Sequence, residues 1–199
     1  FTMNKKVIGI LVCLVLAVGI YFAAGKTEKQ ESSSAEYKDT IVFAANTDIL
    51  THDPQVQNDT TSEQVVRMIY NTLLKFEDDG KVVGDLAESW GVSEDGLTWT
   101  IKLKQGVKFH NGKEVTAADA KATYESALNA KGGGFRTTEI IKIFKKMEAP
   151  DKYTLKITTS VPYGPMEALL CNLSLAVMDA EVLTKHGLEL GNHVEAENG

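Results

Sequence analysis

The sequence predicts an α/β or α+β fold in which helices flank a mixed sheet. Residues 97–103 and 153–157 alternate between apolar and polar side chains, as half-buried strands do. Residues 60–76 and 116–128 place apolar residues three or four positions apart, which is the spacing of an amphipathic helix. These stretches follow one another irregularly and without an internal repeat, so the class is best described as α/β with a mixed sheet.

The first part of the chain has the composition of a membrane-targeting segment. Two lysines near the first methionine precede an uncharged apolar run over residues 7–24. This order is typical of a secretory signal peptide, and the run is also long enough to be retained as a membrane anchor. Both interpretations of residues 1–24 stand. Cys13 lies too early in the run for a lipoprotein signal, so we expect it to be an apolar residue of this segment.

Residues 25–39 predict a flexible linker, and the folded domain is expected over residues 40–199. The linker is polar, rich in serine and without an apolar period. The whole chain has a net charge of −6, and removal of residues 1–24 takes away two lysines and no acidic residue, which leaves −8. A charge of this sign argues against nucleic acid or an anionic membrane surface as a partner. Cys171 is then the only cysteine, so no internal disulfide is expected.

The domain is expected to begin with a strand, a long loop and a helix. Residues 40–45 form a short apolar run suited to a buried strand, and the polar segment 46–59 predicts an ordered loop. Residues 60–76 have helical spacing, and Thr61 with Gln64 fits a capping box. The expected helical stripe consists of Val65, Ile69 and Leu73, with Val66 and Tyr70 beside it. Residues 77–84 are expected to turn the chain.

A strand, a tight turn and a second helix are expected next. The strand 97–103 would bury Leu97, Trp99, Ile101 and Leu103, and after a short turn Val107 and Phe109 continue it. Asn111-Gly112 is the strongest short turn signal in the chain. Thr116 begins the helix, and Asp119 reaches back to it in a variant of the capping box. The buried stripe of this helix is expected to consist of Ala120, Tyr124, Ala127 and Leu128.

The remaining elements are predicted with less regular patterns. The glycine run in residues 131–134 ends the second helix, and a shorter helix is expected over 138–147, burying its apolar side chains. Those side chains are Ile140, Ile143, Phe144 and Met147. Residues 152–159 alternate as a strand, with Tyr153, Leu155 and Ile157 inward. Two helical pieces over 165–173 and 180–186 follow, the second of which ends at Gly187.

No catalytic or metal-binding pattern stands out. The histidines are scattered without metal-ligand spacing; they are His52, His110, His186 and His193. The glycine run follows a helix rather than a strand, which is not the context of a phosphate-binding loop. No serine or cysteine has the surroundings of a nucleophile motif, and Cys171 lies in an apolar stretch that suits a core residue. The sequence therefore predicts a protein that is not an enzyme and has no cofactor.

Four segments carry a resemblance to a known family. They are LAESW at 86–90, SEDGLTWTIKL at 93–103, GVKFHNGKEVTAADA at 106–120, and YTLKI with PYGP within 153–165. In this combination and order they resemble the signature region of the family 5 extracellular solute-binding proteins, the receptors of ABC importers for peptides and nickel. The resemblance covers residues 41–199. It places His110 in a turn between a strand and a capped helix, which implies a structural role for this histidine.

The resemblance implies the first lobe of a two-lobed receptor like the type II periplasmic binding proteins, whose lobes close on a ligand by hinge motion. It also implies export, to the periplasmic space or the outer face of the cytoplasmic membrane, and delivery of ligand to the transmembrane subunits of an ABC permease. The chain stops before a Gly-Thr-Gly-Pro-aromatic segment typical of the family. We therefore expect residues 40–199 to be an incomplete domain without the second lobe, which by itself would not enclose a ligand.

The loop after the first strand is the first candidate for ligand contact. It is polar, contains a proline and is too long for a simple connection, and the matching loop in the family approaches the cleft. Asn46, Thr47 and Asp48 are expected to offer hydrogen bonds to a peptide backbone or amine. His52 would do the same or bind a metal. The alternative is local loop structure, in which Asp48 and Asp53 form Asx turns.

Two further candidates lie later in the chain. Phe135 and Arg136 follow the glycine run, in a segment that faces the cleft in relatives. Arg136 would bind a ligand carboxylate in bidentate fashion, or would be a solvated surface residue. Tyr163 would contact ligand or pack against the domain.

These observations leave three functions open. The leading hypothesis is the substrate-binding component of an ABC importer for oligopeptides or dipeptides, because one cleft that binds the peptide main chain tolerates many side chains. The second is a nickel or metal-chelate receptor of the same family, for which His52 is the only support in the sequence. The third is a truncated, membrane-anchored interaction module without a transport role.

Overall fold

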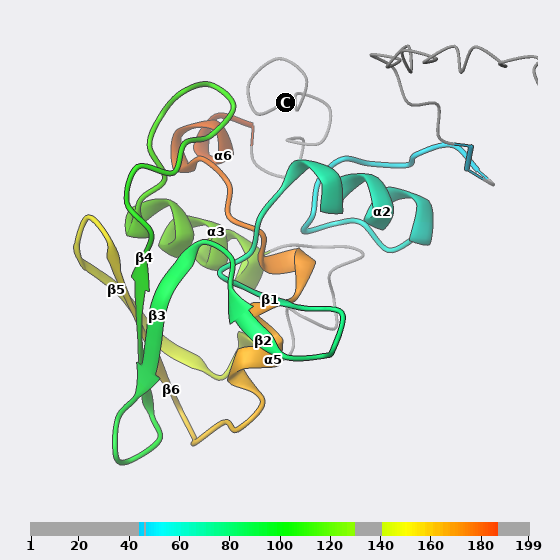
Figure 1. Ribbon diagram of the computed structural model, residues 1–199. Helices are drawn as coiled ribbons and strands as arrows, with labels where there is room; N and C mark the ends of the chain where they lie inside the picture. The colour runs from blue at the N-terminus through cyan, green and yellow to red at the C-terminus, as the bar shows by residue number, and fades with distance from the viewer. Residues whose placement is uncertain (1–43, 46, 130–140, 187–199) are drawn as a thin grey trace, which may run out of the picture. The chain divides into compact units, whose positions relative to one another are not determined.

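The computed structural model describes residues 44–45, 47–129 and 141–186 (Figure 1). The predicted signal segment, the linker and most of the expected first strand lie outside the described residues. Within the described ranges, no helix is both long enough and apolar enough to cross a bilayer. The elements in chain order are α2 (Thr60–Ile69), β1 (Leu74–Phe76), β2 (Val82–Gly84), β3 (Ala87–Val92), β4 (Thr98–Leu103), α3 (Ala117–Asn129), β5 (Phe144–Asp151), β6 (Thr154–Thr159), α5 (Met166–Leu170), the 3-10 helix η1 (Leu173–Leu175) and α6 (Ala180–His186).

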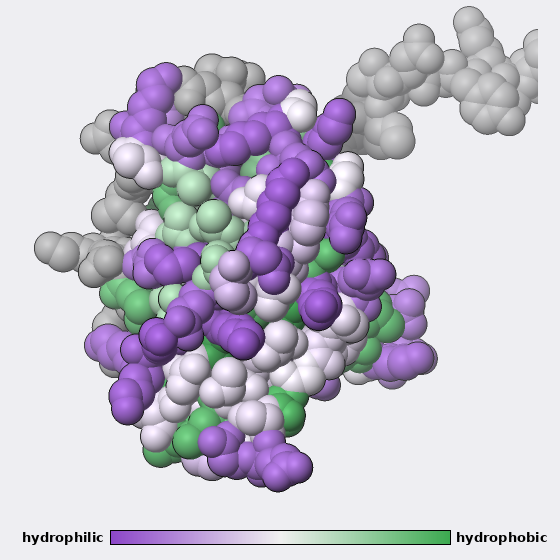
Figure 2. Space-filling view, turned by 90° about the vertical axis from the view of Figure 1, so that its left-hand side faces the viewer, coloured by the Kyte–Doolittle hydropathy of each residue, from purple (hydrophilic) through white to green (hydrophobic). Residues whose placement is uncertain are grey.

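Two antiparallel sheets form the framework. The larger has the strand order β3-β4-β6-β5, and β1 pairs with β2 in a separate hairpin. All strand pairs among the described residues are antiparallel, so the parallel pairing that a mixed sheet implies is not among them. The expected combination of sheets and flanking helices is confirmed. On the side that carries β5, hydrophilic residues are interspersed with residues of intermediate hydropathy and some hydrophobic ones (Figure 2).

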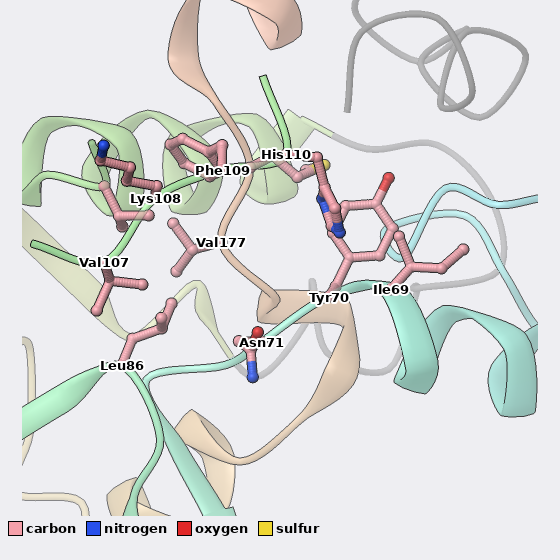
Figure 3. A pocket seen from close by; sticks show the side chains of 11 residues that line it. Ile69, Tyr70, Asn71, Leu86, Val107, Lys108, Phe109, His110 and Val177 are labelled. Carbon is pink, nitrogen blue, oxygen red and sulfur yellow. The ribbon is translucent and has the colours of Figure 1, made fainter. Parts of the chain in front are cut away.

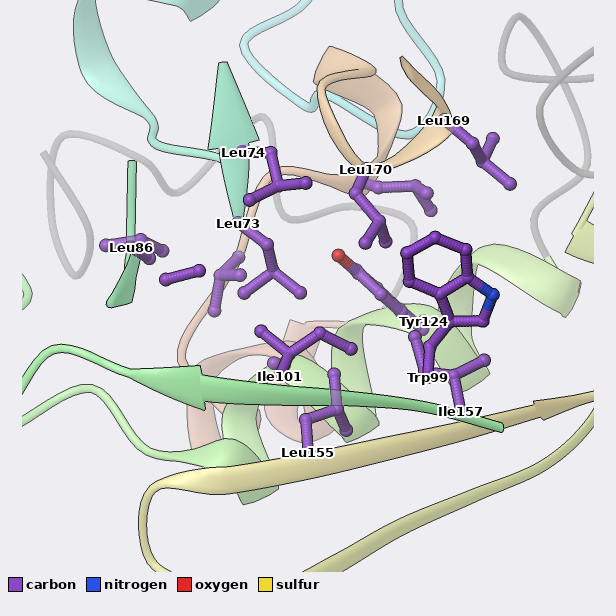
Figure 4. Packing of buried hydrophobic residues seen from close by; sticks show 14 of the residues in the cluster. Leu73, Leu74, Leu86, Trp99, Ile101, Tyr124, Leu155, Ile157, Leu169 and Leu170 are labelled. Atoms are coloured by element: carbon purple, nitrogen blue, oxygen red, sulfur yellow. The ribbon is translucent and has the colours of Figure 1, made fainter. Parts of the chain in front are cut away.

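The core lies on the inner face of the larger sheet, where α3, α5 and the start of β1 cover it (Figure 4). Ile101 on β4 and Leu155 and Ile157 on β6 are fully buried, and Tyr124 of α3 packs on them. The alternation predicted for both strands is therefore confirmed. The Tyr124 ring also lies 6.3 Å, centroid to centroid, from the Phe144 ring of β5, which ties the helix to the sheet edge.

The predicted helix over 60–76 is correct at its start but too long. Its N-cap is Asp59, whose carboxylate accepts the Ser62 N–H at 2.8 Å, rather than Thr61. The helix ends at Ile69, because Tyr70 adopts an extended conformation and Asp85 Oδ2 accepts the Thr72 N–H at 3.1 Å. The chain beyond it forms the hairpin of β1 and β2. Both strands of this hairpin, and β3, were absent from the predicted elements.

The predicted turn and capping box before α3 are confirmed. Gly112 has a φ of 84°, as the second residue of an Asn-Gly turn requires, and the Phe109 carbonyl accepts its N–H at 2.9 Å. Asp119 Oδ2 accepts the Thr116 N–H at 2.9 Å, and the Thr116 hydroxyl accepts the Asp119 N–H at 3.4 Å. The expected stripe of Ala120, Tyr124 and Ala127 is buried, and Leu128 is partly buried.

The helix predicted over 138–147 is wrong from residue 144 onward, where the chain forms the edge strand β5. A bulge between Phe144 and Lys146 inserts one residue into the strand. Phe144 and Met147, three positions apart, consequently pair with the inward-facing Thr159 and Ile157. Because of the bulge, inward-facing side chains of this strand are three positions apart, which is the spacing that predicts a helix. The strand predicted over 152–159 and the helix predicted over 180–186 are confirmed by β6 and α6, whereas the helix predicted over 165–173 is shorter, because α5 ends at Leu170 and η1 follows from Leu173.

The close approach between β2 and β3 gives a test of this packing. A Cβ added at Gly84 would overlap the backbone carbonyl oxygen of Ala87, whereas one added at Gly91 in β3 would meet nothing within 4 Å. We expect Gly84→Ala to lower the free energy of unfolding by about 1–3 kcal/mol, because the backbone must shift. Gly91→Ala, the matched control, should change it by less than about 0.5 kcal/mol. Equal effects in urea denaturation would contradict the close approach.

Candidate functional site

The long loop before α2 is held against the first turn of that helix. The Thr47 hydroxyl lies 2.9 Å from the Thr61 hydroxyl. The Ser62 hydroxyl accepts the backbone N–H groups of Leu50 at 3.0 Å and Thr51 at 3.3 Å. Ser62 is fully buried, so water competes little for these bonds. The helix therefore fixes the path of the first half of the loop.

A buried turn fixes the second half. Asp53 Oδ1 accepts the Gln55 N–H at 2.7 Å, which confirms the Asx turn expected at Asp53. The Gln55 side chain then reaches α3, where its Nε2 donates to the Thr123 carbonyl at 2.8 Å and its Oε1 accepts the Ser126 hydroxyl at 3.0 Å. The loop is thus anchored on two helices, which gives its exposed part a defined position.

Burial makes Asp53 an unusual carboxyl group. Its relative exposure is 2%. Burial raises the pKa of Asp53 to about 6, although hydrogen bonds from the Gln55 and Val56 N–H groups act in the opposite direction. Burial and the charge of Asp53 also raise the pKa of Tyr70 above its usual range. At neutral pH the loop therefore contains a buried negative charge, and this costs stability.

Three of the predicted ligand residues share this loop. Thr47 and Asp48 are exposed, and His52 is partly buried. Their side chains lie on the part of the loop that precedes the buried turn. The exposed carboxylate of Asp48 and hydroxyl of Thr47 are groups that can hydrogen bond to a peptide amine or N–H.

Tyr163, the fourth predicted residue that the structure describes, lies outside this loop. Tyr163 lies in the connection between β6 and α5 and packs, partly buried, against the core. Figure 1 shows this connection at the opposite end of the sheet from the loop. Asn46, Phe135 and Arg136 lie outside the described residues. The structure thus describes Thr47, Asp48 and His52 in one loop and Tyr163 elsewhere.

A polar network fixes the turn that contains His110. Lys113 Nζ lies 2.7 Å from Asp179 Oδ1 and 3.2 Å from a Glu181 carboxylate oxygen, and Asn111 Nδ2 donates to Asp179 Oδ2 at 3.1 Å. Burial alone would raise the pKa of Asp179, but the hydrogen bonds from Lys113 and Asn111 lower it below its usual value. This network joins the turn to the start of α6.

His110 itself lines a small pocket between this turn and the end of α2 (Figure 3). Its apolar walls include Leu86, Val107 and Val177, and His110 lies beside Tyr70. The cavity volume is about 50 Å³, which suits a small apolar group and is far below the size of a peptide site. His110 is exposed in the turn, as the structural interpretation expects.

The described residues contain no group of three His, Cys, Asp or Glu side chains that could hold a metal ion. His52 therefore has no set of metal ligands around it within those ranges. Cys171 is 8% exposed, and burial raises the pKa of its thiol to about 11, which agrees with a core residue.

Sequence reasoning missed the residues that hold the loop. Gln55 has no motif of its own, and its partners on α3 are more than sixty positions away in the chain. Ser62 and Asp59 carried a usable signal, because serine and aspartate before an apolar run mark a helix start. The link between Lys113 and Asp179 also spans distant positions and has no local pattern.

The chain was compared with protein families and with known proteins. The model of the bacterial extracellular solute-binding proteins, family 5 (middle region), matches residues 81–193. Among curated proteins, the glutathione-binding protein GsiB of Pectobacterium atrosepticum is 33% identical over 171 residues, which are 86% of this chain and 33% of that protein. The chain thus spans about a third of the length of this relative.

Three solved structures are similar. The binding protein AgaA of A. tumefaciens R10, in complex with agropinic acid, is 35% identical with a TM-score of 0.66, over 71% of this chain and 28% of that one. Helicobacter pylori DppA with the peptide STSA is 25% identical with a TM-score of 0.65, over 76% and 33%. Campylobacter jejuni NikZ with Ni(L-His) is 26% identical with a TM-score of 0.61, over 72% and 28%.

The buried carboxyl of Asp53 gives a pH-dependent prediction. Its pKa is raised from 3.8 to about 6 on folding, so its contribution favours the folded state below about pH 4 and is lost as the pH rises through 6. Asp53→Asn keeps the Oδ1 acceptor and removes the charge. We expect the variant to exceed the parent in stability by up to about 3 kcal/mol at about pH 8, with the gain vanishing near about pH 4.

Urea denaturation across this pH range checks the expectation. The matched control is Asp79→Asn, which changes an exposed Asx-turn residue whose Oδ1 accepts the Lys81 N–H at 2.9 Å. The control should show no such gain at high pH. A constant difference between Asp53→Asn and the parent at all pH values would show that Asp53 does not titrate in the folded protein as described.

Proposed function

The chain belongs to the bacterial extracellular solute-binding proteins of family 5, and from this premise we propose that it binds small peptides for delivery to an ABC permease. Members of this family are substrate-binding components of importers, so the chain is a binding protein rather than an enzyme. The peptide ligand is the finer part of the proposal. Likeness to a glutathione-binding protein and to a peptide-bound DppA supports it.

The observation that carries the proposal is the anchored loop before α2. The Ser62 hydroxyl accepts a backbone N–H of the loop, and the Gln55 side chain of the loop donates to α3, while Thr47 and Asp48 remain exposed. A polar loop that is already ordered loses little conformational entropy when it binds. A peptide presents an ammonium group, N–H donors and carbonyl acceptors at regular spacing, and a main-chain reader can accept many sequences. In this proposal Asp48 receives the ligand ammonium.

The remaining predicted contacts complete the proposed site. Asn46 and Thr47 would hydrogen bond to the peptide main chain, and Arg136 would pair with the ligand carboxylate. Phe135 and Tyr163 would supply apolar contact. Of these, Tyr163 has the weakest support, because it already packs against the core.

A nickel chelate is the second candidate ligand. Likeness to NikZ in complex with Ni(L-His) favours it, and His52 is a partly buried imidazole in the candidate loop. In a nickel chelate most metal-coordinating atoms come from the chelator, so the protein needs to supply few of them. One histidine would then be enough for the protein to select the chelate over a peptide.

The cellular setting is part of the proposal. Residues 1–24 would direct export and then be cleaved, or retained as an anchor beside the permease, and residues 25–39 would be the linker to a domain that begins near residue 40. A receptor for an ABC permease would act on the outer face of the cytoplasmic membrane or in the periplasmic space. An anchored module without transport activity is the alternative for this setting.

Calorimetric titration of the protein expressed from its complete reading frame tests the ligand. We expect glutathione or the peptide STSA to bind with micromolar Kd, and Asp48→Asn to weaken binding about tenfold or more, because a charge-assisted hydrogen bond is lost. Asp79→Asn, which changes an exposed carboxylate outside the loop, should leave Kd unchanged. Binding of Ni(L-His) that His52→Ala abolishes, with no heat from either peptide, would replace the peptide proposal with the chelate.

A further inference from the structure

A second concave site lies at the other end of α2 from the candidate loop. It is bounded by Arg67 near the end of α2, by Lys75 and Phe76 of β1, by Asp85 after β2 and by Leu173 of η1. Its volume is about 350 Å³, within the range of small-molecule sites. It has no residue in common with the loop, which is bonded to the first turn of α2. We call this site the Arg67–Lys75 pocket.

Two cations line the pocket, and each is paired with a carboxylate. Arg67 donates through Nε at 3.1 Å and Nη2 at 2.5 Å to one oxygen of Glu63. A guanidinium has five N–H donors in a planar fork, so this pairing uses only part of its capacity. The Lys75 ammonium lies 3.7 Å from Asp85 Oδ1, a long ion pair, and the side chain is 56% exposed. Both cations can therefore turn toward an anion without breaking a buried contact.

Several hydrogen bonds hold Asp85, the acidic residue of the pocket. Asp85 Oδ2 accepts the Asn71 side-chain amide at 2.9 Å and the Thr72 N–H at 3.1 Å. Its backbone carbonyl accepts the Lys104 ammonium at 2.6 Å. Asp85 Oδ2 is thus satisfied by two N–H donors, and Oδ1 faces the Lys75 ammonium at 3.7 Å.

An aromatic ring stands beside these charges. Phe76 of β1 is 54% exposed, although burial of a phenyl ring would be favourable, and Leu173 contributes a buried apolar wall. The combination of two cations, one fixed acid and an exposed ring is suited to a ligand with a carboxylate at one end and an apolar group at the other.

We propose that the Arg67–Lys75 pocket binds a small organic carboxylate with an apolar substituent. The carboxylate lies between the Arg67 guanidinium and the Lys75 ammonium, and the apolar group covers Phe76 and Leu173. This site is separate from the peptide site proposed above, and neither proposal depends on the other.

The test uses the full chain with 3-phenylpropionate as the probe and NMR titration of backbone amides. We expect shifts confined to the residues that line the pocket, which are 67, 70–72, 75–76, 85, 171 and 173, with a Kd in the millimolar range. Arg67→Gln and Lys75→Gln should each weaken binding about fivefold or more, because a charged hydrogen bond is lost. Lys81→Gln, which changes an exposed lysine of the same hairpin outside the pocket, should have no effect.

Two matched probes separate charge from apolar contact. The neutral 3-phenylpropan-1-ol should bind at least about fivefold more weakly, and acetate should also bind more weakly because it lacks the apolar group. Equal affinity for the alcohol and the carboxylate, shifts outside these residues, or no effect of both glutamine variants would overturn the proposal. If 3-phenylpropionate binds as expected and no peptide binds, the pocket proposal stands and the peptide proposal fails. If a peptide binds and 3-phenylpropionate does not, the peptide proposal stands and the pocket proposal fails.

Discussion

The described fold depends on the buried carboxylate of Asp119 at the start of α3. Its Oδ2 accepts the Thr116 N–H at 2.9 Å and the Thr116 hydroxyl at 2.6 Å, and its Oδ1 accepts the Ala180 N–H at 3.0 Å. Lys113 Nζ lies 3.7 Å from the same Oδ1. One carboxylate thus caps α3, holds the first residue of α6 and faces the His110 turn. Because it is 2% exposed, its charge is tolerable only with these partners, and a buried charge left unpaired costs several kcal/mol.

Other polar residues of α3 also hydrogen bond to segments that lie far from it in the chain. Asp119, Thr123 and Ser126 are spaced so that they follow one side of α3. The Thr123 hydroxyl accepts the Met178 N–H at 3.0 Å, and the Thr123 carbonyl and the Ser126 hydroxyl bind Gln55. α3 therefore has two functional faces. Its apolar stripe packs on the sheet, and its polar stripe positions the candidate loop and the segment before α6.

Sequence patterns predicted those helices and strands that are determined by interactions between residues close together in the chain. The alternation of Trp99, Ile101 and Leu103 and the cap of Thr116 with Asp119 were correct because strand pleat and capping act over a few positions. The prediction of a helix over 138–147 was wrong, because the bulge in β5 places inward-facing residues three positions apart, as a helix does. The role of the loop residues Thr47, Asp48 and His52 in ligand contact stays a prediction. Their anchors were not predicted, since Gln55 meets α3 only through the tertiary fold.

The two candidate sites differ in what they need in order to bind tightly. A small ligand usually has most of its surface buried in its site. Thr47 and Asp48 of the proposed peptide site are exposed, and they line neither of the two pockets described above. In the proposed function, a second surface that closes over the ligand would supply this burial. The Arg67–Lys75 pocket is lined by described residues alone, so its affinity depends on side chains of this part of the chain. Closure should therefore change binding at the loop strongly and binding at this pocket little.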